Sequence, residues 1–232
     1  IAAEIQLVST KALLPAILAN KGPDVSLGMN QADVNNLALR NALYDLENFS
    51  DIDNVKEEFY DYALVPFEWN KGLFALPETQ TWPMLFYRSD ILEEMNISLS
   101  ELDTWDSILS SVLPKLKKSS LTFGIMPTIQ NYLTFVYQRG GELYINDGRN
   151  SGLSSSQAVE SMKLFSMLYK QYGFELSFDF SNRFRTGEMP IAISDFTSYN
   201  SLTLFAGEIK GLWGMLPIPG TLQEDGTVDH TS

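Results

Sequence analysis

Three stretches of the sequence place aromatic rings directly beside amide, hydroxyl or carboxylate side chains, in segments where loops are predicted. They are Gln80-Thr81-Trp82-Pro83, Asn131-Tyr132 and Asp195-Phe196-Thr197-Ser198-Tyr199-Asn200. The flat face of an aromatic ring packs against the C–H face of a sugar, while amide and hydroxyl groups hydrogen-bond its hydroxyls. The pattern therefore favours a binding site for a sugar.

The residue types that most catalytic and metal sites require are missing or scarce. The sequence has no cysteine, which excludes disulfides, thiolate catalysis and thiolate zinc sites. Its one histidine, His230, lies two residues from the end, so a Ser-His-Asp triad lacks a base and histidine metal sites lack ligands. No glycine-rich nucleotide loop and no His-Glu-x-x-His pair occurs. We expect no cofactor, no metal and no catalytic residue.

Acidic residues outnumber basic ones by 29 to 16, for a net charge of −13. Such a surface repels the phosphates of nucleic acids, so we expect no nucleic-acid partner and a neutral or cationic ligand. A glycosidase that works with two carboxylates remains an alternative because acids are plentiful. No pair stands out, since Glu57-Glu58 and Glu93-Glu94 fall in helices with a solvent-facing pattern.

Helices alternate with short apolar strands along the chain, which predicts an α/β protein with mostly parallel sheets. The 232 residues, 44% of them apolar, can form one large domain or two small ones. The expected strands are residues 24–27, 84–87, 190–194 and 212–218. The expected helices are residues 11–20, 33–44, 53–63, 105–118, 132–139 and 199–205.

Several residues have the chemistry to begin, turn or pack these elements. The expected helix N-caps are Asp33, Thr104 and Ser154. A turn is predicted from Asn70 to Gly72, and Trp105 is expected in the core. In the helix after Ser154, the expected core-facing stripe is Met162, Phe165 and Tyr169.

The ends of the sequence suggest an excised part of a longer protein. It opens with Ile1-Ala2-Ala3-Glu4 and without an initiator methionine, and no signal peptide is recognisable. No run of about 18 apolar residues that could span a membrane occurs.

Four motifs follow one another over nearly the whole chain. They are Lys21-Gly22-Pro23-Asp24-Val25; Ala75-Leu76-Pro77 with Leu85-Phe86-Tyr87-Arg88-Ser89-Asp90; Thr104-Trp105-Asp106; and Phe184-Arg185-Thr186-Gly187-Glu188-Met189-Pro190-Ile191-Ala192-Ile193. Their order and spacing resemble those of family 1 extracellular solute-binding proteins, the maltose-binding-protein-like receptors of ABC importers. The chain departs from that family at Trp69-Asn70-Lys71-Gly72 and at Arg88-Ser89, and it lacks the family's first strand and C-terminal helices.

The resemblance implies a type II periplasmic-binding-protein-like fold, α/β in class, with two lobes and incomplete at both termini. Residues 1–81 would form part of the first lobe and residues 82–232 the second, with the hinge crossing near residues 78–84. The solute would lie in the cleft between the lobes. The family's contacts map to Asn30, Gln31, Gln80, Thr81, Trp82, Tyr132, Asp195, Phe196 and Tyr199.

The function that follows is an extracellular binding component, not an enzyme, that delivers a carbohydrate or oligosaccharide to an ABC permease. We expect a monomer, periplasmic or tethered as a cell-surface lipoprotein, whose partners are the solute and the permease's transmembrane subunits. Three alternatives remain. One is a non-sugar solute, such as a polyamine or a peptide, with Asp195 as a counter-ion; the others are the carboxylate glycosidase and a pure interaction module.

Overall fold

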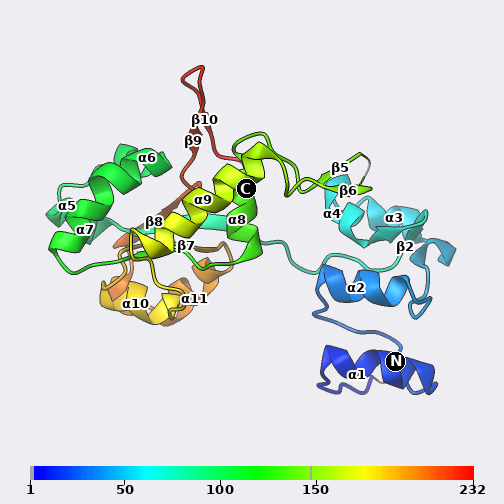
Figure 1. Ribbon diagram of the computed structural model, residues 1–232. Coiled ribbons are helices and arrows are strands. Elements are labelled where there is room, and N and C mark those ends of the chain that lie inside the picture. Colours follow the sequence, from blue (N-terminus) through cyan, green and yellow to red (C-terminus); the bar gives the residue numbers. More distant parts are fainter. Residues whose placement is uncertain (1–2, 147) are drawn as a thin grey trace. The chain divides into compact units, whose positions relative to one another are not determined.

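The protein, seen in a computed structural model that describes residues 3–146 and 148–232, divides into two compact units (Figure 1). Unit 1 comprises Ile1–Gln80 and unit 2 comprises Thr81–Ser232. Both mix helices with strands, so the predicted α/β class is confirmed. Within the described residues, no helix is both long and apolar enough to cross a membrane.

Unit 1 is built from short helices and one small hairpin around a core of Ile52, Leu64 and Leu73. Its elements are α1 (Thr10–Leu18), α2 (Gln31–Ala38), α3 (Ile52–Lys56), α4 (Asp61–Leu64), β1 (Glu68–Trp69) and β2 (Gly72–Leu73). The predicted turn is confirmed, because Asn70 and Lys71 join β1 to β2 with φ angles of 49° and 69°. Two consecutive positive φ angles suit the tight turn of a twisted hairpin.

Three local predictions for unit 1 are wrong. Residues 24–27 form no strand, and Val25 and Leu27 are exposed. The expected helix 53–63 is divided into α3 and α4. The helix expected from Asp33 is α2, which begins at Gln31 because Asn30, and not Asp33, is its cap: the Asn30 side chain accepts a hydrogen bond from the Asp33 N–H at 2.8 Å. Either residue type can cap a helix, so the choice depended on where the chain turns.

Unit 2 is organised around a four-stranded sheet in the order β4-β7-β3-β8. Its strands are β3 (Pro83–Arg88), β4 (Phe123–Gly124), β7 (Ile191–Asp195) and β8 (Trp213–Leu216). β4 runs parallel to β7, but β3 is antiparallel to both β7 and β8. The prediction of mostly parallel sheets is therefore wrong, because alternation of helices and strands does not by itself set strand direction.

Helices cover both faces of this sheet, with α8 and α9 on one side and α10 and α11 on the other (Figure 1). The helices of unit 2 are α5 (Ser89–Glu94), α6 (Trp105–Ser107), α7 (Leu113–Lys118), α8 (Ile129–Tyr137), α9 (Ser156–Lys170), α10 (Phe180–Thr186) and α11 (Ser198–Phe205). The π-helical segment Ile108–Val112 joins α6 to α7. The remaining short strands are β5 (Tyr144–Ile145), β6 (Asn150–Ser151), β9 (Thr221–Leu222) and β10 (Val228–Asp229).

Alternation along β3 sends neighbouring side chains into two different cores. Leu85 belongs to the larger core, which it shares with α8 and α9, whereas Phe86 belongs to a smaller core with α10 and α11. Successive side chains of a strand point to opposite faces, so this follows from the extended backbone. By the same parity, Trp82 and Met84 belong to the face of Phe86.

The predictions for packing and caps in unit 2 are partly correct. Trp105 is 2% exposed, and Thr104 caps its helix, as predicted. Ser155, not Ser154, caps α9 by accepting from the Ala158 N–H at 3.2 Å. Met162 is exposed, so the predicted core stripe is wrong at that position, although Phe165 is buried.

Arg88 ties α10 to the sheet. Its buried guanidinium donates to the carbonyls of Phe184 and Arg185, each at 3.0 Å, and forms a bidentate pair with Asp90. Carbonyls at the end of a helix lack helical partners, so a cation placed there satisfies them. Gly187, with φ of 82°, then ends the helix before β7.

Candidate functional site

Four aromatic side chains form a row on unit 2, where β3 begins and β7 ends. The rings of Trp82 and Phe196 are stacked, with centres 4.7 Å apart and planes 15° apart. Phe196 and Tyr199 are parallel at 6.0 Å, and Tyr199 meets the edge of Trp213 at 5.7 Å. Offset and edge contacts at these distances are favourable for aromatic rings.

Backbone hydrogen bonds place three members of the row, Trp82, Phe196 and Tyr199. Pro83, the first residue of β3, pairs with Asp195, the last residue of β7. The Phe196 N–H then donates to the Trp82 carbonyl at 2.9 Å, and the Tyr199 N–H donates to the Phe196 carbonyl at 2.9 Å. Pro83 also favours an extended Trp82, because proline restricts the residue before it. The chain around Trp82 is therefore held at several points.

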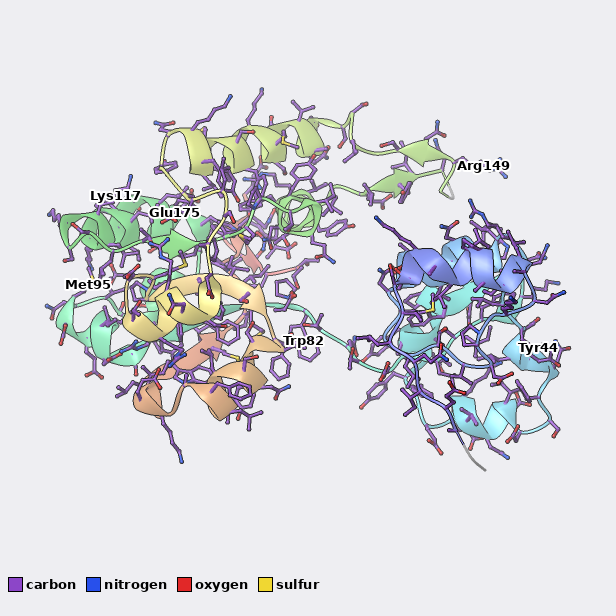
Figure 2. The ribbon with its side chains drawn as sticks, turned by 90° about the horizontal axis from the view of Figure 1, so that it is seen from below. Tyr44, Trp82, Met95, Lys117, Arg149 and Glu175 are labelled. Carbon is purple, nitrogen blue, oxygen red and sulfur yellow. The ribbon has the colours of Figure 1, made fainter. Side chains whose placement is uncertain are left out.

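Two rings of the row, those of Trp82 and Tyr199, are open to solvent. Trp82 is 42% exposed and Tyr199 is 41% exposed, whereas Trp105 in the core is 2% exposed. Figure 2 shows Trp82 at the surface of unit 2, where the chain enters β3. An exposed aromatic ring backed by a second ring offers its free face as a rigid, flat surface for an apolar ligand face.

A pocket of about 270 Å³ lies near the start of β3 and the end of β7, where Pro83 and Asp195 line it. These are the chain neighbours of Trp82 and Phe196, so by strand alternation they point to the opposite face of the sheet from the two rings. Its wall is lined by Pro83, Met126, Thr128, Gln130, Asn131, Phe178, Phe180, Ile193, Ser194 and Asp195. The wall therefore combines aromatic and aliphatic groups with amide, hydroxyl and carboxylate groups, a mixture that suits a small polar organic solute.

The N-terminus of α8 supplies the polar part of the wall. Thr128 caps this helix by accepting from the Asn131 N–H at 3.2 Å, and the Asn131 side chain donates to the Met126 carbonyl at 2.8 Å. These bonds fix the loop ahead of the helix. Gln130, in the first turn, is exposed and free to point at a ligand.

Asp195 is the only ionisable residue among the described residues that line the pocket. Its carboxylate is exposed at the end of β7. An isolated carboxylate accepts hydrogen bonds from sugar hydroxyls and attracts cations, but it repels anions. The pocket is thus suited to neutral or positively charged solutes.

Of the site residues expected from the sequence, the structure brings three together, because Trp82, Phe196 and Tyr199 form the row. Asp195 lines the pocket on the other face of the sheet. Thr81 is the first residue of unit 2 and is exposed.

Tyr132 lies apart from them. Its ring is 4% exposed between α8 and α9, and its hydroxyl donates to the Ala158 carbonyl at 3.0 Å. Burial raises the pKa of this phenol above its usual value. Its chain neighbour Asn131 is the member of the pair that reaches the pocket.

The remaining expected residues belong to unit 1. Asn30 is occupied in capping α2, where its amide also donates to the Asp33 carboxylate at 2.9 Å. Gln31 is exposed in the first turn of that helix, and Gln80 is exposed at the end of the unit. Neither Asn30 nor Gln31 is among the described residues that line the pocket of unit 1.

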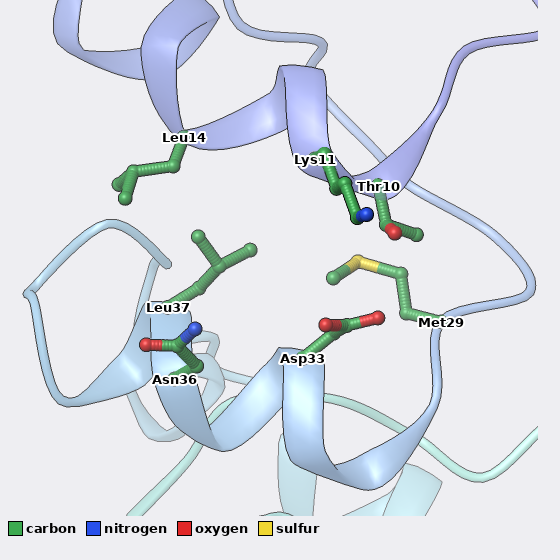
Figure 3. Close-up of a pocket in the computed structure, with 7 residues that line it drawn as sticks. All are labelled: Thr10, Lys11, Leu14, Met29, Asp33, Asn36 and Leu37. Atoms are coloured by element: carbon green, nitrogen blue, oxygen red, sulfur yellow. The ribbon is translucent and has the colours of Figure 1, made fainter.

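The pocket of unit 1 lies between α1 and α2. Figure 3 shows Lys11 and Asp33 pointing toward each other across it, with Met29 beside them. Leu14 and Leu37 form its apolar side. This second, smaller pocket has a volume of about 220 Å³, and its wall carries one positive charge, on Lys11, and one negative charge, on Asp33.

Several residues were not predicted from the sequence: Thr128, Gln130, Phe178 and Phe180 of the pocket, and Trp213 of the row. A signal existed for Phe178 and Phe180, which flank the cap residue Asp179 and so repeat the pattern of an aromatic ring beside a polar group. Trp213 gave no such signal, because it lies in a strand, β8, and not in a predicted loop.

The described residues contain no group of three or more His, Asp or Glu side chains arranged to hold a metal ion. His230 shares a hydrogen bond of 2.8 Å between its Nδ1 and the Ile218 carbonyl, and its Nε2 lies 3.4 Å from Asp103. It therefore contacts the body of unit 2 near the end of the chain.

Comparison with known proteins identifies the family of this chain. A family model described as bacterial extracellular solute-binding protein matches residues 9–228. No curated protein matches the chain significantly in sequence.

Solved structures share the fold at low sequence identity. An ABC transporter solute-binding protein from Thermotoga lettingae, bound with α-D-tagatose, superposes with a TM-score of 0.76 and 20% identity over 90% of this chain and 57% of its own. The GacH receptor of Streptomyces glaucescens, solved unliganded and with acarbose, superposes with a TM-score of 0.76 and 16% identity, over 90% of this chain and 55% of its own. UgpB from Mycobacterium tuberculosis, in complex with glycerophosphocholine, superposes with a TM-score of 0.74 and 16% identity, over 94% of this chain and 57% of its own. The chain thus has the fold of these binding proteins and spans little more than half of their length.

Proposed function

This chain belongs to the family of bacterial extracellular solute-binding proteins, and from that premise we propose that it is the receptor component of an ABC importer that binds a carbohydrate or oligosaccharide. It hands the solute to the transmembrane subunits of a permease. It acts outside the cytoplasmic membrane as a monomer, in the periplasm or as a surface lipoprotein.

The observation that carries the choice of ligand is the exposed face of Trp82, backed by the ring of Phe196. A sugar ring presents an apolar C–H face and a rim of hydroxyls. The C–H face packs on Trp82, and the hydroxyls at the rim of the ring remain free to bond with polar groups of the protein and with water. The sugars named with the solved structures of similar fold agree with this choice.

The test is a thermal-shift screen of mono- and oligosaccharides, followed by isothermal titration of any sugar that raises the unfolding midpoint. A ligand that binds only the folded protein stabilises it in proportion to the logarithm of its saturation. Binding that disappears in Trp82→Ala and survives in Trp69→Ala, a matched exposed tryptophan of unit 1, supports the proposal. A sugar that binds both variants as tightly as the parent contradicts the site.

A second candidate is a cationic or zwitterionic solute, favoured by the single carboxylate of the pocket. Asp195 would then form an ion pair with the solute, and the net charge of −13 would assist its approach. UgpB, of similar fold, was solved with glycerophosphocholine, which carries a quaternary ammonium group.

Salt separates the two candidates. Affinity for a neutral sugar changes little with ionic strength, because no ion pair is screened. A roughly tenfold loss of affinity between low and high salt, abolished in Asp195→Asn, would favour the cationic solute.

We propose binding without catalysis. A glycosidase needs two carboxyl groups about 5–10 Å apart around the scissile bond. The lining of the unit 2 pocket includes one carboxylate among its described residues, which supports a binding role. A panel of aryl glycosides tests the proposal; turnover that is lost on replacing one carboxylate of this unit would refute it.

The proposal includes a hinge near residues 78–84, between lobes made of residues 1–81 and 82–232. The two compact units divide between Gln80 and Thr81, in agreement with such a hinge. Ligand binding that selects one arrangement of the lobes should change backbone amide exchange at the hinge, because hinge residues absorb the change in backbone angles. Hydrogen exchange of residues 78–84 with and without ligand measures this, and unchanged exchange at saturation counts against a hinge there.

A further inference from the structure

The aromatic row connects the exposed Trp82 to the smaller core of unit 2. At its inner end, Trp213 lies with its ring centre 6.0 Å from that of Phe86 and 6.4 Å from that of Phe184. Both phenylalanines are fully buried. The inner end of the row is therefore fixed by close packing, in which side chains have one well-defined position.

The outer end lacks such packing. Trp82 precedes the first paired residue of β3, and its side chain is 42% exposed. A free tryptophan side chain at the surface samples several rotamers, and fixing one of them on ligand binding costs entropy. Stacking against Phe196 removes that freedom before the ligand arrives.

Phe196 is itself only partly buried, and the exposed ring of Tyr199 stacks against it. The rings of Phe196 and Tyr199 are parallel within 3°, and Tyr199 rests on Trp213 at 64°. Tyr199 is thus the link between the outer stack and the ring that the core holds.

We propose that Tyr199 and Trp213 are positioning residues, which set the orientation of Trp82 through Phe196 and so raise affinity by pre-organising the binding surface. This inference rests on the proposed function, and it changes the role of Tyr199 from a solute contact to a support. Trp213, which packs against the smaller core, also supports Tyr199 from below the row.

The test uses Tyr199→Leu, which breaks the row at an exposed position where folding tolerates the change. Tyr199→Phe retains the ring and is the rescue variant. Tyr144→Leu is the matched control, because Tyr144 in β5 is also exposed and does not belong to the row. The readouts are the indole N–H signal of Trp82 in a ¹H–¹⁵N spectrum, assigned by its loss in Trp82→Phe, and the affinity for a bound sugar.

Tyr199→Leu should shift the Trp82 signal in the absence of any ligand and lower affinity roughly three- to tenfold, the range for losing one aromatic pair. Tyr199→Phe should restore both, and Tyr144→Leu should change neither. An unmoved Trp82 signal in Tyr199→Leu overturns the inference. So does loss of affinity in Tyr199→Phe with the Trp82 signal unchanged, because the hydroxyl would then contact the solute directly.

The ligand-free signal separates this inference from the proposed function. If the Trp82 signal shifts in Tyr199→Leu but no carbohydrate binds the parent protein, the row positions Trp82 and the proposed ligand is wrong. If a carbohydrate binds and the signal does not shift, the ligand is right and the positioning role is wrong.

Discussion

Phe196 holds Trp82 in two ways at once: its ring stacks on the indole at 4.7 Å, and its N–H donates to the Trp82 carbonyl at 2.9 Å. Side chain and backbone are thereby fixed by the same neighbour. The residues come from segments more than a hundred positions apart in the sequence, joined by the pairing of Pro83 with Asp195. The binding surface is consequently a product of the sheet and not of one loop.

Replacement of Trp82 should affect binding more than folding. Trp82→Ala should weaken binding of the identified sugar by roughly 1–3 kcal/mol, the range for a well-packed aromatic contact. Trp105→Ala should instead destabilise the fold by about 3–5 kcal/mol, because that ring is 2% exposed and packs 4.5 Å from Phe135. Isothermal titration and urea unfolding of both variants measure the two effects. A Trp82→Ala protein that binds normally but unfolds early would place the indole in the core and refute the site.

Gln138 should be essential for stability, although it is not among the described residues that line the pocket of unit 2. Its buried Oε1 accepts from Trp105 Nε1 at 3.2 Å and from the Thr221 hydroxyl at 2.9 Å, and its Nε2 donates to the Pro219 carbonyl at 3.0 Å. Gln138→Ala leaves these groups unpaired and should cost roughly 2–4 kcal/mol in the free energy of unfolding. The control is Gln171→Ala, at an exposed helix end, which should cost far less. Equal urea midpoints for the two variants would disprove the network's importance.

Glu101 should make stability depend on pH in the acid range. The Lys115 ammonium, the Ser111 hydroxyl and the Ser98 N–H lower the pKa of its carboxyl from 4.5 to about 2. The folded state therefore binds this proton less readily than the unfolded state does. The resulting stability is complete above about pH 4.5 and is lost as the pH falls toward about 2.

The matching experiment compares Glu101→Gln with the parent protein by urea unfolding at about pH 6 and about pH 2. The variant should be less stable by up to about 1 kcal/mol at the higher pH, a modest value because the pair is partly exposed to solvent. The difference should shrink at the lower pH. A difference that is the same at both values would show that the carboxylate charge contributes nothing.

Relief of backbone strain should stabilise unit 1. Lys71 adopts a φ of 69° in the turn between β1 and β2, a conformation that costs residues with a side chain more than it costs glycine. Lys71→Gly should raise the free energy of unfolding of this unit by roughly 0.5–1 kcal/mol. Lys117→Gly is the opposite control, since Lys117 lies in α7, where glycine should destabilise by about 1 kcal/mol. Hydrogen exchange, measured separately for the two units, reports both effects. If Lys71→Gly does not slow exchange in unit 1, including its hairpin, the strain argument is wrong.

Much of the secondary structure could be predicted from the sequence, because it depends on local chemistry. The turn at Asn70 and Lys71, the cap at Thr104 and the strands β3, β7 and β8 were predicted, because each depends on side chains close together in the chain. Trp82, Asp195, Phe196 and Tyr199 were selected for the same reason, as aromatic rings beside polar groups near strand ends. Whether they contact a solute remains a prediction.

The tertiary structure decided what neighbouring positions cannot. Asn131 and Tyr132 are adjacent, yet Asn131 lines the pocket and Tyr132 is buried, because each residue of a helix is rotated by about 100° from the last. Strand direction followed from pairing and not from the alternation of elements, so β3 is antiparallel to both neighbours. The link from Trp82 to Trp213 exists only once the sheet has formed, because stacking depends on distances between side chains that come from separate segments of the chain.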